Sequence, residues 1–143
     1  MPANTAPIFS INGDVSNNSG TGMNALITAA ANDYTGAGAN NSLVFTAGTN
    51  GSWIERLRFK AGGTNTASVM RIFINNGSAN TTAANNVFYG EISLPATTAI
   101  ATAATVEIDY PMGFAIPASF RIYVGLATAV AAGWVCTPIA GEY

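Results

Sequence analysis

The feature that most constrains the fold of this chain is the alternation of apolar and polar side chains over short runs. Within residues 53–60, Trp53, Leu57 and Phe59 share one parity. The basic residues of the run share the other parity: Arg56, Arg58 and Lys60. Because successive side chains of a strand point to opposite faces, one face of this run is predicted to enter a core. The opposite face carries like charges two residues apart, which repel one another unless acidic groups face them.

A second β-rich run, residues 68–77, follows a connection rich in Gly, Asn and Thr. Two such runs joined by a connection of this kind are typical of antiparallel strands that pair with each other. We therefore expect residues 53–60 and 68–77 to be neighbours in one sheet. The second run adds Arg71, so four of the five basic residues of the chain fall within this stretch.

Further short runs share the same strand-like composition and are bounded by Gly, Asn or Pro: residues 8–11, 23–31, 43–46, 87–94, 106–110, 120–126 and 133–139. The run 23–31 is rich in alanine, so a helix remains an alternative there, with strand preferred. Asn50-Gly51 is expected to turn the chain into the 53–60 strand. Pro111 and Pro117 are expected to bracket a turn.

These runs predict an all-β fold, an antiparallel β-sandwich of about eight or nine strands. Long crossovers near residues 12–22, 78–86 and 95–104 favour a jelly-roll-like arrangement, with an immunoglobulin-like or other Greek-key sandwich as the alternative. Trp53 and Trp134 are the predicted core anchors. Residues 8–143 form one domain, and residues 1–7 are expected to be an extended arm that lies across a neighbouring subunit, or else a disordered terminus.

Charge is scarce in this chain, and its scarcity excludes several classes of partner. Charged residues make up 8% of the sequence, against roughly 25% in an average soluble domain. The net charge of −2 is too small to indicate nucleic acid or an anionic membrane as a partner. No apolar run approaches the ~20 residues of a membrane helix. Ala, Thr, Asn and Gly supply about half of the chain, and a surface so poor in charge indicates contacts with other subunits.

The residue types that enzymes use are sparse. Histidine is absent, and the single Cys136 is expected to be a buried structural thiol, which also suits synthesis in the cytoplasm. The acidic residues Glu91, Glu107 and Asp109 could supply a glycosidase-type pair, but salt-bridged or solvated side chains are the preferred interpretation. Asp14 and Asp33 could help to hold calcium, with solvated loops preferred. We expect no catalytic residue, no cofactor and no metal.

The basic residues have two interpretations. They pair with Glu91, Glu107 and Asp109 in the same subunit, or they dock onto acidic groups of another subunit or protein. The docking interpretation involves four side chains, whose guanidinium groups suit bidentate contacts to carboxylates: Arg56, Arg58, Lys60 and Arg71. The arm adds three more predicted contact residues: Pro2, Asn4 and Pro7.

Several segments of the chain resemble a family of small virion proteins of tailed bacteriophages and prophages, some of which look like capsid cement (decoration) proteins. The resemblance is carried by residues 47–52 (Ala-Gly-Thr-Asn-Gly-Ser), 54–65, 71–77 (Arg-Ile-Phe-Ile-Asn-Asn-Gly), 84–86, 94–98 (Leu-Pro-Ala-Thr-Thr), 131–134 and 141–143. It covers about residues 43–143, with a looser match at the start of the chain.

The resemblance implies a mechanical role. Such proteins look like trimeric β-sandwiches at three-fold positions on the outside of the head, where they bind the major capsid protein and hold the shell against the pressure of packaged DNA. It therefore implies a virion protein of the capsid surface, with no enzymatic activity. A receptor- or carbohydrate-binding module of a tail or head fibre is the alternative, for which Tyr34, Tyr89, Tyr123 and Tyr143 could supply the aromatic contacts.

Overall fold

The computed structural model describes residues 10–17 and 22–143, and strands dominate them. These residues contain eight strands and one short 3₁₀ helix: β1 (Asn12–Asp14), β2 (Ser42–Thr46), β3 (Ser52–Ala61), β4 (Ser68–Asn75), η1 (Ala83–Asn85), β5 (Asn86–Leu94), β6 (Glu107–Ile116), β7 (Arg121–Leu126) and β8 (Trp134–Glu142). The predicted arm, residues 1–7 with Pro2, Asn4 and Pro7, lies outside the described residues.

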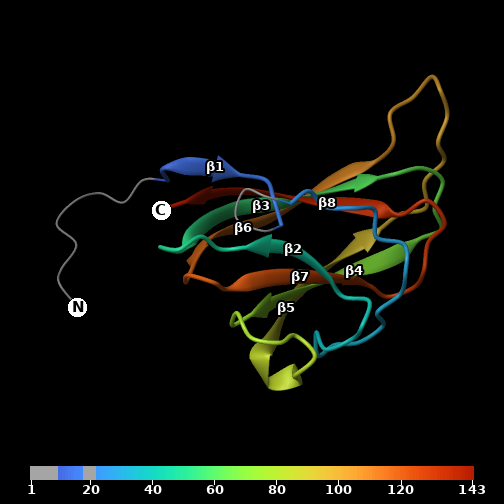
Figure 1. Ribbon diagram of the computed structural model, residues 1–143. Coiled ribbons are helices and arrows are strands. Elements are labelled where there is room, and N and C mark those ends of the chain that lie inside the picture. Colours follow the sequence, from blue (N-terminus) through green and yellow to red (C-terminus); the bar gives the residue numbers. More distant parts are fainter. Residues whose placement is uncertain (1–9, 18–21) are drawn as a thin grey trace, which may run out of the picture.

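The strands form two four-stranded antiparallel sheets that are packed into a sandwich (Figure 1). Sheet A has the order β1-β8-β3-β6, and sheet B has the order β2-β7-β4-β5. Every connection between successive strands crosses from one sheet to the other, except the one between β4 and β5. This is the strand order of a jelly roll. The predicted fold class, an all-β jelly-roll-like sandwich, is therefore confirmed.

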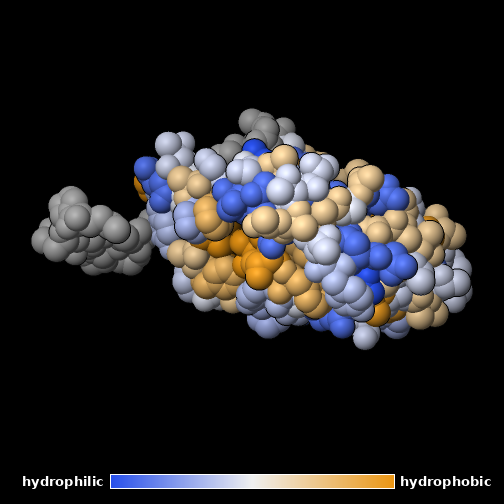
Figure 2. Space-filling view, turned by 90° about the horizontal axis from the view of Figure 1, so that it is seen from below, coloured by the Kyte–Doolittle hydropathy of each residue, from blue (hydrophilic) through white to orange (hydrophobic). Residues whose placement is uncertain are grey.

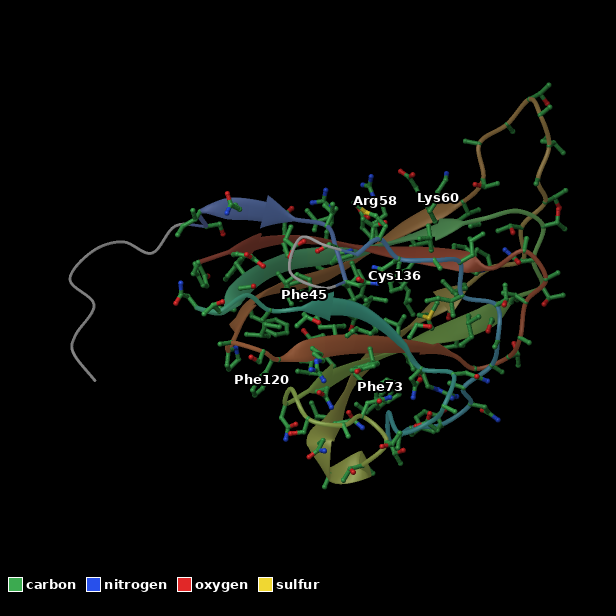
Figure 3. The ribbon with its side chains drawn as sticks, viewed as in Figure 1. Phe45, Arg58, Lys60, Phe73, Phe120 and Cys136 are labelled. Carbon is green, nitrogen blue, oxygen red and sulfur yellow. The ribbon has the colours of Figure 1, made fainter. Side chains whose placement is uncertain are left out.

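The core lies between the sheets and is filled by large apolar side chains from both. Leu57 and Phe59 are fully buried in sheet A, as the alternation predicted, and so is Trp134, which was predicted as a core anchor. Phe45 of sheet B and Cys136 of sheet A lie between the two layers in Figure 3. Burial of one such large apolar side chain contributes about 1.5–3 kcal/mol to folding. The core is continuous across both sheets, which joins them into one domain.

Strands β3 and β4 do not pair with each other, and the prediction that they form a hairpin is wrong. β3 pairs with β6 and β8 in sheet A, whereas β4 pairs with β5 and β7 in sheet B. The connection between them crosses the end of the sandwich and is held by the buried Asn65. Its Nδ2 donates to the carbonyl oxygen of Gly133 at 3.0 Å, and its Oδ1 accepts the N–H groups of Ala132 and Gly133.

Strand β6 runs through Pro111, where a turn was predicted. A proline lacks the N–H that a central strand needs, but β6 is the edge strand of sheet A. The register shifts between the Arg56–Pro111 and Ile54–Phe114 pairs, which places an extra residue in β6. Gly113 lies in this bulge with a φ of +70°, a conformation that glycine adopts without steric cost. The edge and the bulge together accommodate the proline.

Three further predictions of element position are wrong. The first strand of the described residues occupies Asn12–Asp14, the residues predicted to end a strand at 8–11; residues 10 and 11 are not in a strand, and residues 8 and 9 lie outside the described residues. The segment 23–31 forms no continuous strand and makes only the isolated bridges of Ile27 with Trp134 and Ala30 with Leu126. Residues 78–86, considered a crossover, connect the neighbouring strands β4 and β5. In the first two cases, pairing with distant strands outweighs local composition.

Candidate functional site

The outer face of sheet A carries half of the charged side chains of this protein, six of twelve. We call it the ladder face, and four rows cross it from β8 through β3 to β6: Val135–Lys60–Glu107, Thr137–Arg58–Asp109, Ile139–Arg56–Pro111 and Gly141–Trp53–Ala115. A basic column on β3 therefore lies beside an acidic column on β6. In Figure 3 the side chains of Arg58 and Lys60 point away from the sandwich.

The two columns are joined by ion pairs within the chain. Arg58 donates from Nε to Asp109 Oδ1 at 2.8 Å and from Nη2 to Asp109 Oδ2 at 3.0 Å. Arg56 Nε lies 3.3 Å from Asp109 Oδ2, and Lys60 Nζ lies 3.7 Å from Glu107 Oε2. Arg56 also pairs with Glu55 beside it on β3. The expected partners Glu107 and Asp109 thus face the basic residues in the same subunit.

Ionisation of the ladder is favoured by its own geometry. The hydrogen bond from Arg58 holds the pKa of Asp109 below its ordinary value, and the same bond to Asp109 raises the pKa of Arg58. Both groups are therefore charged near neutral pH. Their side chains are about 40% exposed, so solvent and salt screen the pair. The ladder is a surface feature that a partner can contact.

Arg71 does not belong to this surface, although the sequence placed it with the other three. It lies on β4 in sheet B and is only 7% exposed. Its guanidinium carbon is 3.8 Å from the centre of the Tyr34 ring, and its Nε is 3.7 Å from Glu91 Oε2. Its Nη1 donates to the carbonyl oxygen of Asp33 at 3.3 Å. Arg71 therefore anchors a loop of its own subunit.

That loop, residues 32–41, covers part of the outer face of sheet B, and we call it the cover. Below it, Phe73 is fully buried and its ring centre is 5.6 Å from that of Phe88. Tyr34 of the cover meets Phe88 edge-on, with 5.4 Å between ring centres. A Cβ on Gly36 would lie 3.0 Å from the Phe73 ring, and φ is +74° at this position, so both the close approach and the backbone conformation favour glycine. In Figure 3, Phe73 lies on the side of sheet B away from sheet A.

Asp33 organises the cover internally. Its Oδ1 accepts the backbone N–H groups of Thr35 and Gly36, and its Oδ2 accepts the backbone N–H of Gly38 and the side-chain Nδ2 of Asn41. Burial alone would raise the pKa of Asp33, but the hydrogen bonds from Asn41, Thr35 and Gly36 outweigh it and lower that pKa. The carboxylate is satisfied by its own loop, which is the role of an internal anion rather than of a calcium ligand.

Trp53 was predicted to be a core anchor, and this prediction is wrong. Its side chain is 40% exposed on the ladder face. The register of β3 against β8 shifts between Ile54 and Arg56, so Glu55 is an extra residue in β3. A one-residue shift moves every earlier side chain to the opposite face. The bulge thus keeps Leu57 and Phe59 in the core and turns Trp53 outward, between the small neighbours Ala115 and Gly141.

The side chains considered as candidate catalytic groups or metal ligands are buried or paired with other groups of the chain. Cys136 is fully buried, and loss of solvation raises the pKa of its thiol well above the ordinary value. Glu107 and Asp109 face basic side chains, and Glu91 lies in the other sheet beside Arg71. Asp14 accepts hydrogen bonds from the backbone N–H and the hydroxyl of Ser16. Within residues 10–17 and 22–143, no three His, Cys, Asp or Glu side chains are grouped as metal ligands.

Two adjoining depressions of about 240 and 300 Å³ lie between residues 22–29 and the edge strand β2. They share Leu26, Ile27 and Ser42 as lining residues. Their linings are apolar, amide-bearing or hydroxyl-bearing and include no ionisable side chain among the described residues. Neither depression therefore offers a group for acid–base chemistry.

Apolar side chains are also exposed on β5, the edge strand of sheet B. Val87 is 56% exposed, and Phe88 and Tyr89 are partly exposed beside it. Tyr89 reaches across to the edge of sheet A, where its ring centre is 5.3 Å from that of Phe114 and 6.3 Å from that of Tyr110. Figure 2 shows apolar residues gathered near the middle of the face seen from below in Figure 1, with polar residues around them. Such patches indicate contact with another molecule.

No family model, curated protein or solved structure matches this chain in the three comparisons that were made. No helix in the described residues is long and apolar enough to cross a membrane.

Sequence reasoning missed the residues that hold the loops. Asn65, Asp33 and Tyr34 each lie in a segment rich in Gly, Asn and Thr, where many similar residues are merely solvated. The alternation of the flanking strands carries no information about which loop residue is buried. The exposure of Trp53 was also missed, because a bulge leaves no local signal in the sequence.

Proposed function

We propose that this chain is a non-enzymatic structural protein of a bacteriophage virion, a capsid cement protein that binds the outside of the head and stabilises it against internal DNA pressure. The observation that carries the proposal is the exposed apolar edge on β5, with Val87 56% exposed, in a protein with very few charges. A surface of this kind is suited to contact with a large partner. The resemblance of residues 43–143 to phage virion proteins supplies the identity of that partner, the major capsid protein.

The proposal includes a homo-oligomer, a trimer, at the three-fold positions of the shell. In a cyclic trimer each subunit presents the same patch to the capsid, so three weak contacts act together. Because these contacts are repeated over the whole shell, they resist expansion of the shell without any catalytic activity. The arm with Pro2, Asn4 and Pro7 and the basic residues Arg56, Arg58, Lys60 and Arg71 remain the predicted contact residues, and Arg71 acts in this scheme by holding the cover.

The proposal is tested by adding the purified protein to emptied phage heads that lack it. Binding is measured by co-sedimentation and shell stability by the temperature of disruption, and both are expected to rise with protein concentration. Val87→Asp should weaken binding, because it places a charge in the apolar edge without touching the core. Thr81→Asp, an exposed position in the β4–β5 connection, is the matched control. Absence of binding by the unaltered protein would refute the proposal.

A receptor- or carbohydrate-binding module is the second candidate, and exposed tyrosines are the observation that favours it. Tyr34 is 57% exposed and Tyr89 is partly exposed, so each could lie against a sugar ring. Tyr123 is buried in β7 and does not contribute. One ring face of Tyr34 already carries the guanidinium of Arg71, which limits the platform. Glycan binding without affinity for heads would favour this candidate over the cement role.

A further inference from the structure

The ladder face is complementary to itself. Its basic column on β3 and its acidic column on β6 lie on neighbouring strands, roughly 4.8 Å apart. Counting Glu55, the face holds three acidic and three basic side chains, so it has no net charge: Arg56, Arg58, Lys60, Glu55, Glu107 and Asp109. A partner surface of a single sign would meet as much repulsion as attraction on it. A matching partner needs an acidic column over β3 and a basic column over β6.

At the other end of the ladder face, the neighbouring residues on β3 and β6 are complementary in size rather than in charge. Trp53 is a large side chain on β3, and Ala115 is its small neighbour on β6. Next to them on the ladder face, Arg56 on β3 is opposite Pro111 on β6. At each height along the strands, the larger or basic residue is on β3, and the smaller or acidic one is on β6.

We propose that the ladder face binds a second copy of this chain, face to face, about a two-fold axis that runs parallel to the strands between β3 and β6. Rotation about this axis exchanges β3 with β6 and keeps each residue at its height along the strands. Such a contact is isologous, because both copies use the same surface. It resembles the aligned packing of two sheets, which lie about 10 Å apart.

The register of the rows defines the contacts in this arrangement. Arg58 lies over the partner's Asp109, and Lys60 lies over the partner's Glu107. Each carboxylate, already paired within its own chain, gains a second basic neighbour, which strengthens charge-assisted hydrogen bonding. Trp53 lies over the partner's Ala115, where the small side chain leaves space for the indole. A buried tryptophan flanked by an arginine is typical of an interface hot spot.

The shape of the face favours a protein partner over a small ligand. Small ligands bind in concave sites, and the two depressions described above lie beside β2, on another part of the molecule. The β5–β6 connection rises beside the ladder face at one end (Figure 1). Because the axis follows the strands, the two copies of this connection stand at the same end on opposite sides of the contact. They therefore flank the paired sheets.

The proposal is tested with two variants that cannot pair with themselves. Arg58→Asp leaves two acidic side chains in the row that contains Arg58 and Asp109, and Asp109→Arg leaves two basic ones there. Each variant alone is expected to dimerise about 100-fold or more weakly than the unaltered protein, because like charges oppose one another across the axis. An equimolar mixture is expected to recover the dimer as a one-to-one heterodimer. Molar masses are measured by light scattering and the composition of the dimer by native mass spectrometry.

The apolar end of the face has its own test. Ala115→Trp fills the space that the partner's Trp53 would occupy, and it should abolish the dimer while leaving the fold intact, because Ala115 is exposed. Ala79→Trp, at an exposed position in the β4–β5 connection, is the control and should leave the dimer unchanged. Circular dichroism and thermal unfolding verify that all four variants are folded.

The outcomes separate this contact from the proposed capsid role. The two-fold contact requires an even number of 14.6 kDa chains in solution: two, or six if the three-fold contact also forms. A monomer, a plain trimer, unchanged association of both charge variants, or their failure to associate on mixing would each overturn it. Binding to phage heads is a separate measurement and can fail while the dimer forms.

Discussion

The outer faces of both sheets carry arginine and aromatic side chains, but the two faces differ in how far these side chains are buried. On sheet A, Arg58 and Trp53 are exposed, and the charges are balanced across neighbouring strands. On sheet B, Arg71 and Phe73 occupy equivalent outward positions but are buried beneath residues 32–41. The cover and the neighbouring strand β5 together bury these two side chains. We therefore expect an outward arginine or aromatic residue to stabilise this fold more where a loop closes over it than where it is exposed.

The largest expected effect comes from removing an aromatic side chain from each face. Phe73→Ala should lower the free energy of unfolding by about 3–5 kcal/mol, because it leaves a cavity between sheet B and the cover. Trp53→Ala removes a side chain that is 40% exposed and should change it by about 1 kcal/mol or less in the monomer. Urea denaturation of both variants measures the comparison. Equal losses would show that the cover does not seal sheet B.

The second comparison removes one arginine from each face. Arg71→Met should cost about 2–3 kcal/mol, because it removes the contact to Tyr34 and leaves the carbonyl oxygen of Asp33 without its donor. Arg58→Met should have a much smaller effect on unfolding, since solvent screens its pair with Asp109. The urea midpoints of the two variants, measured at one salt concentration, rank them. The reverse order would contradict the assignment of Arg71 as an anchor.

A third comparison uses two glycines with positive φ. Gly113 lies in the bulge of β6 at φ +70° with open space around it, so Gly113→Ala should cost only the conformational term, about 1 kcal/mol. Gly36 lies in the cover at φ +74°, and an added Cβ would lie 3.0 Å from Phe73. Gly36→Ala should therefore cost about 1 kcal/mol more than Gly113→Ala. The unfolding temperatures of the two variants measure this difference. Equal shifts would indicate that the cover moves to accommodate the added methyl group at little cost.

The smallest expected effect is a pH dependence. The pKa of Asp33 is lowered from its ordinary value of 3.8 by its hydrogen bonds, so its contribution to stability is present above that value. The contribution is lost as the pH falls through the folded-state pKa. Asp33→Asn should cost about 1 kcal/mol at pH 7, and the difference from the unaltered protein should shrink below about pH 4. A difference that stays constant between pH 7 and pH 3 would refute this role of the carboxylate.

Much of the fold could be predicted from local sequence. The runs at 43–46, 53–60, 68–77, 87–94, 120–126 and 133–139 each coincide with a strand to within two residues at the start and three at the end, because alternation and turn residues are local signals. Strand partners were harder to predict. The buried Asn65 carries the β3–β4 connection across the end of the sandwich, and its partners Ala132 and Gly133 are distant in sequence. Pairing with distant strands also decides that Pro111 lies within β6 rather than at a turn.

The candidate surface was predicted in part. The sequence placed Arg56, Arg58 and Lys60 on one face, and the register adds that Asp109 and Glu107 lie beside them. It could not separate Arg71 from them, because distance along the chain does not report which sheet a strand joins. Nor could it place Trp53 outside, since the bulge at Glu55 exists only through pairing with β8 and β6.

By itself, the sequence determined the all-β character of the protein, the limits of most strands and the burial of Trp134. It did so because the two-residue periodicity of a strand and the backbone freedom of Gly and Asn act over a few neighbouring residues. The tertiary structure decided the jelly-roll order, the outward turn of Trp53 and the burial of Arg71. These depend on which strands pair, in which register, and which loop covers which face, and such contacts form between residues far apart in the chain.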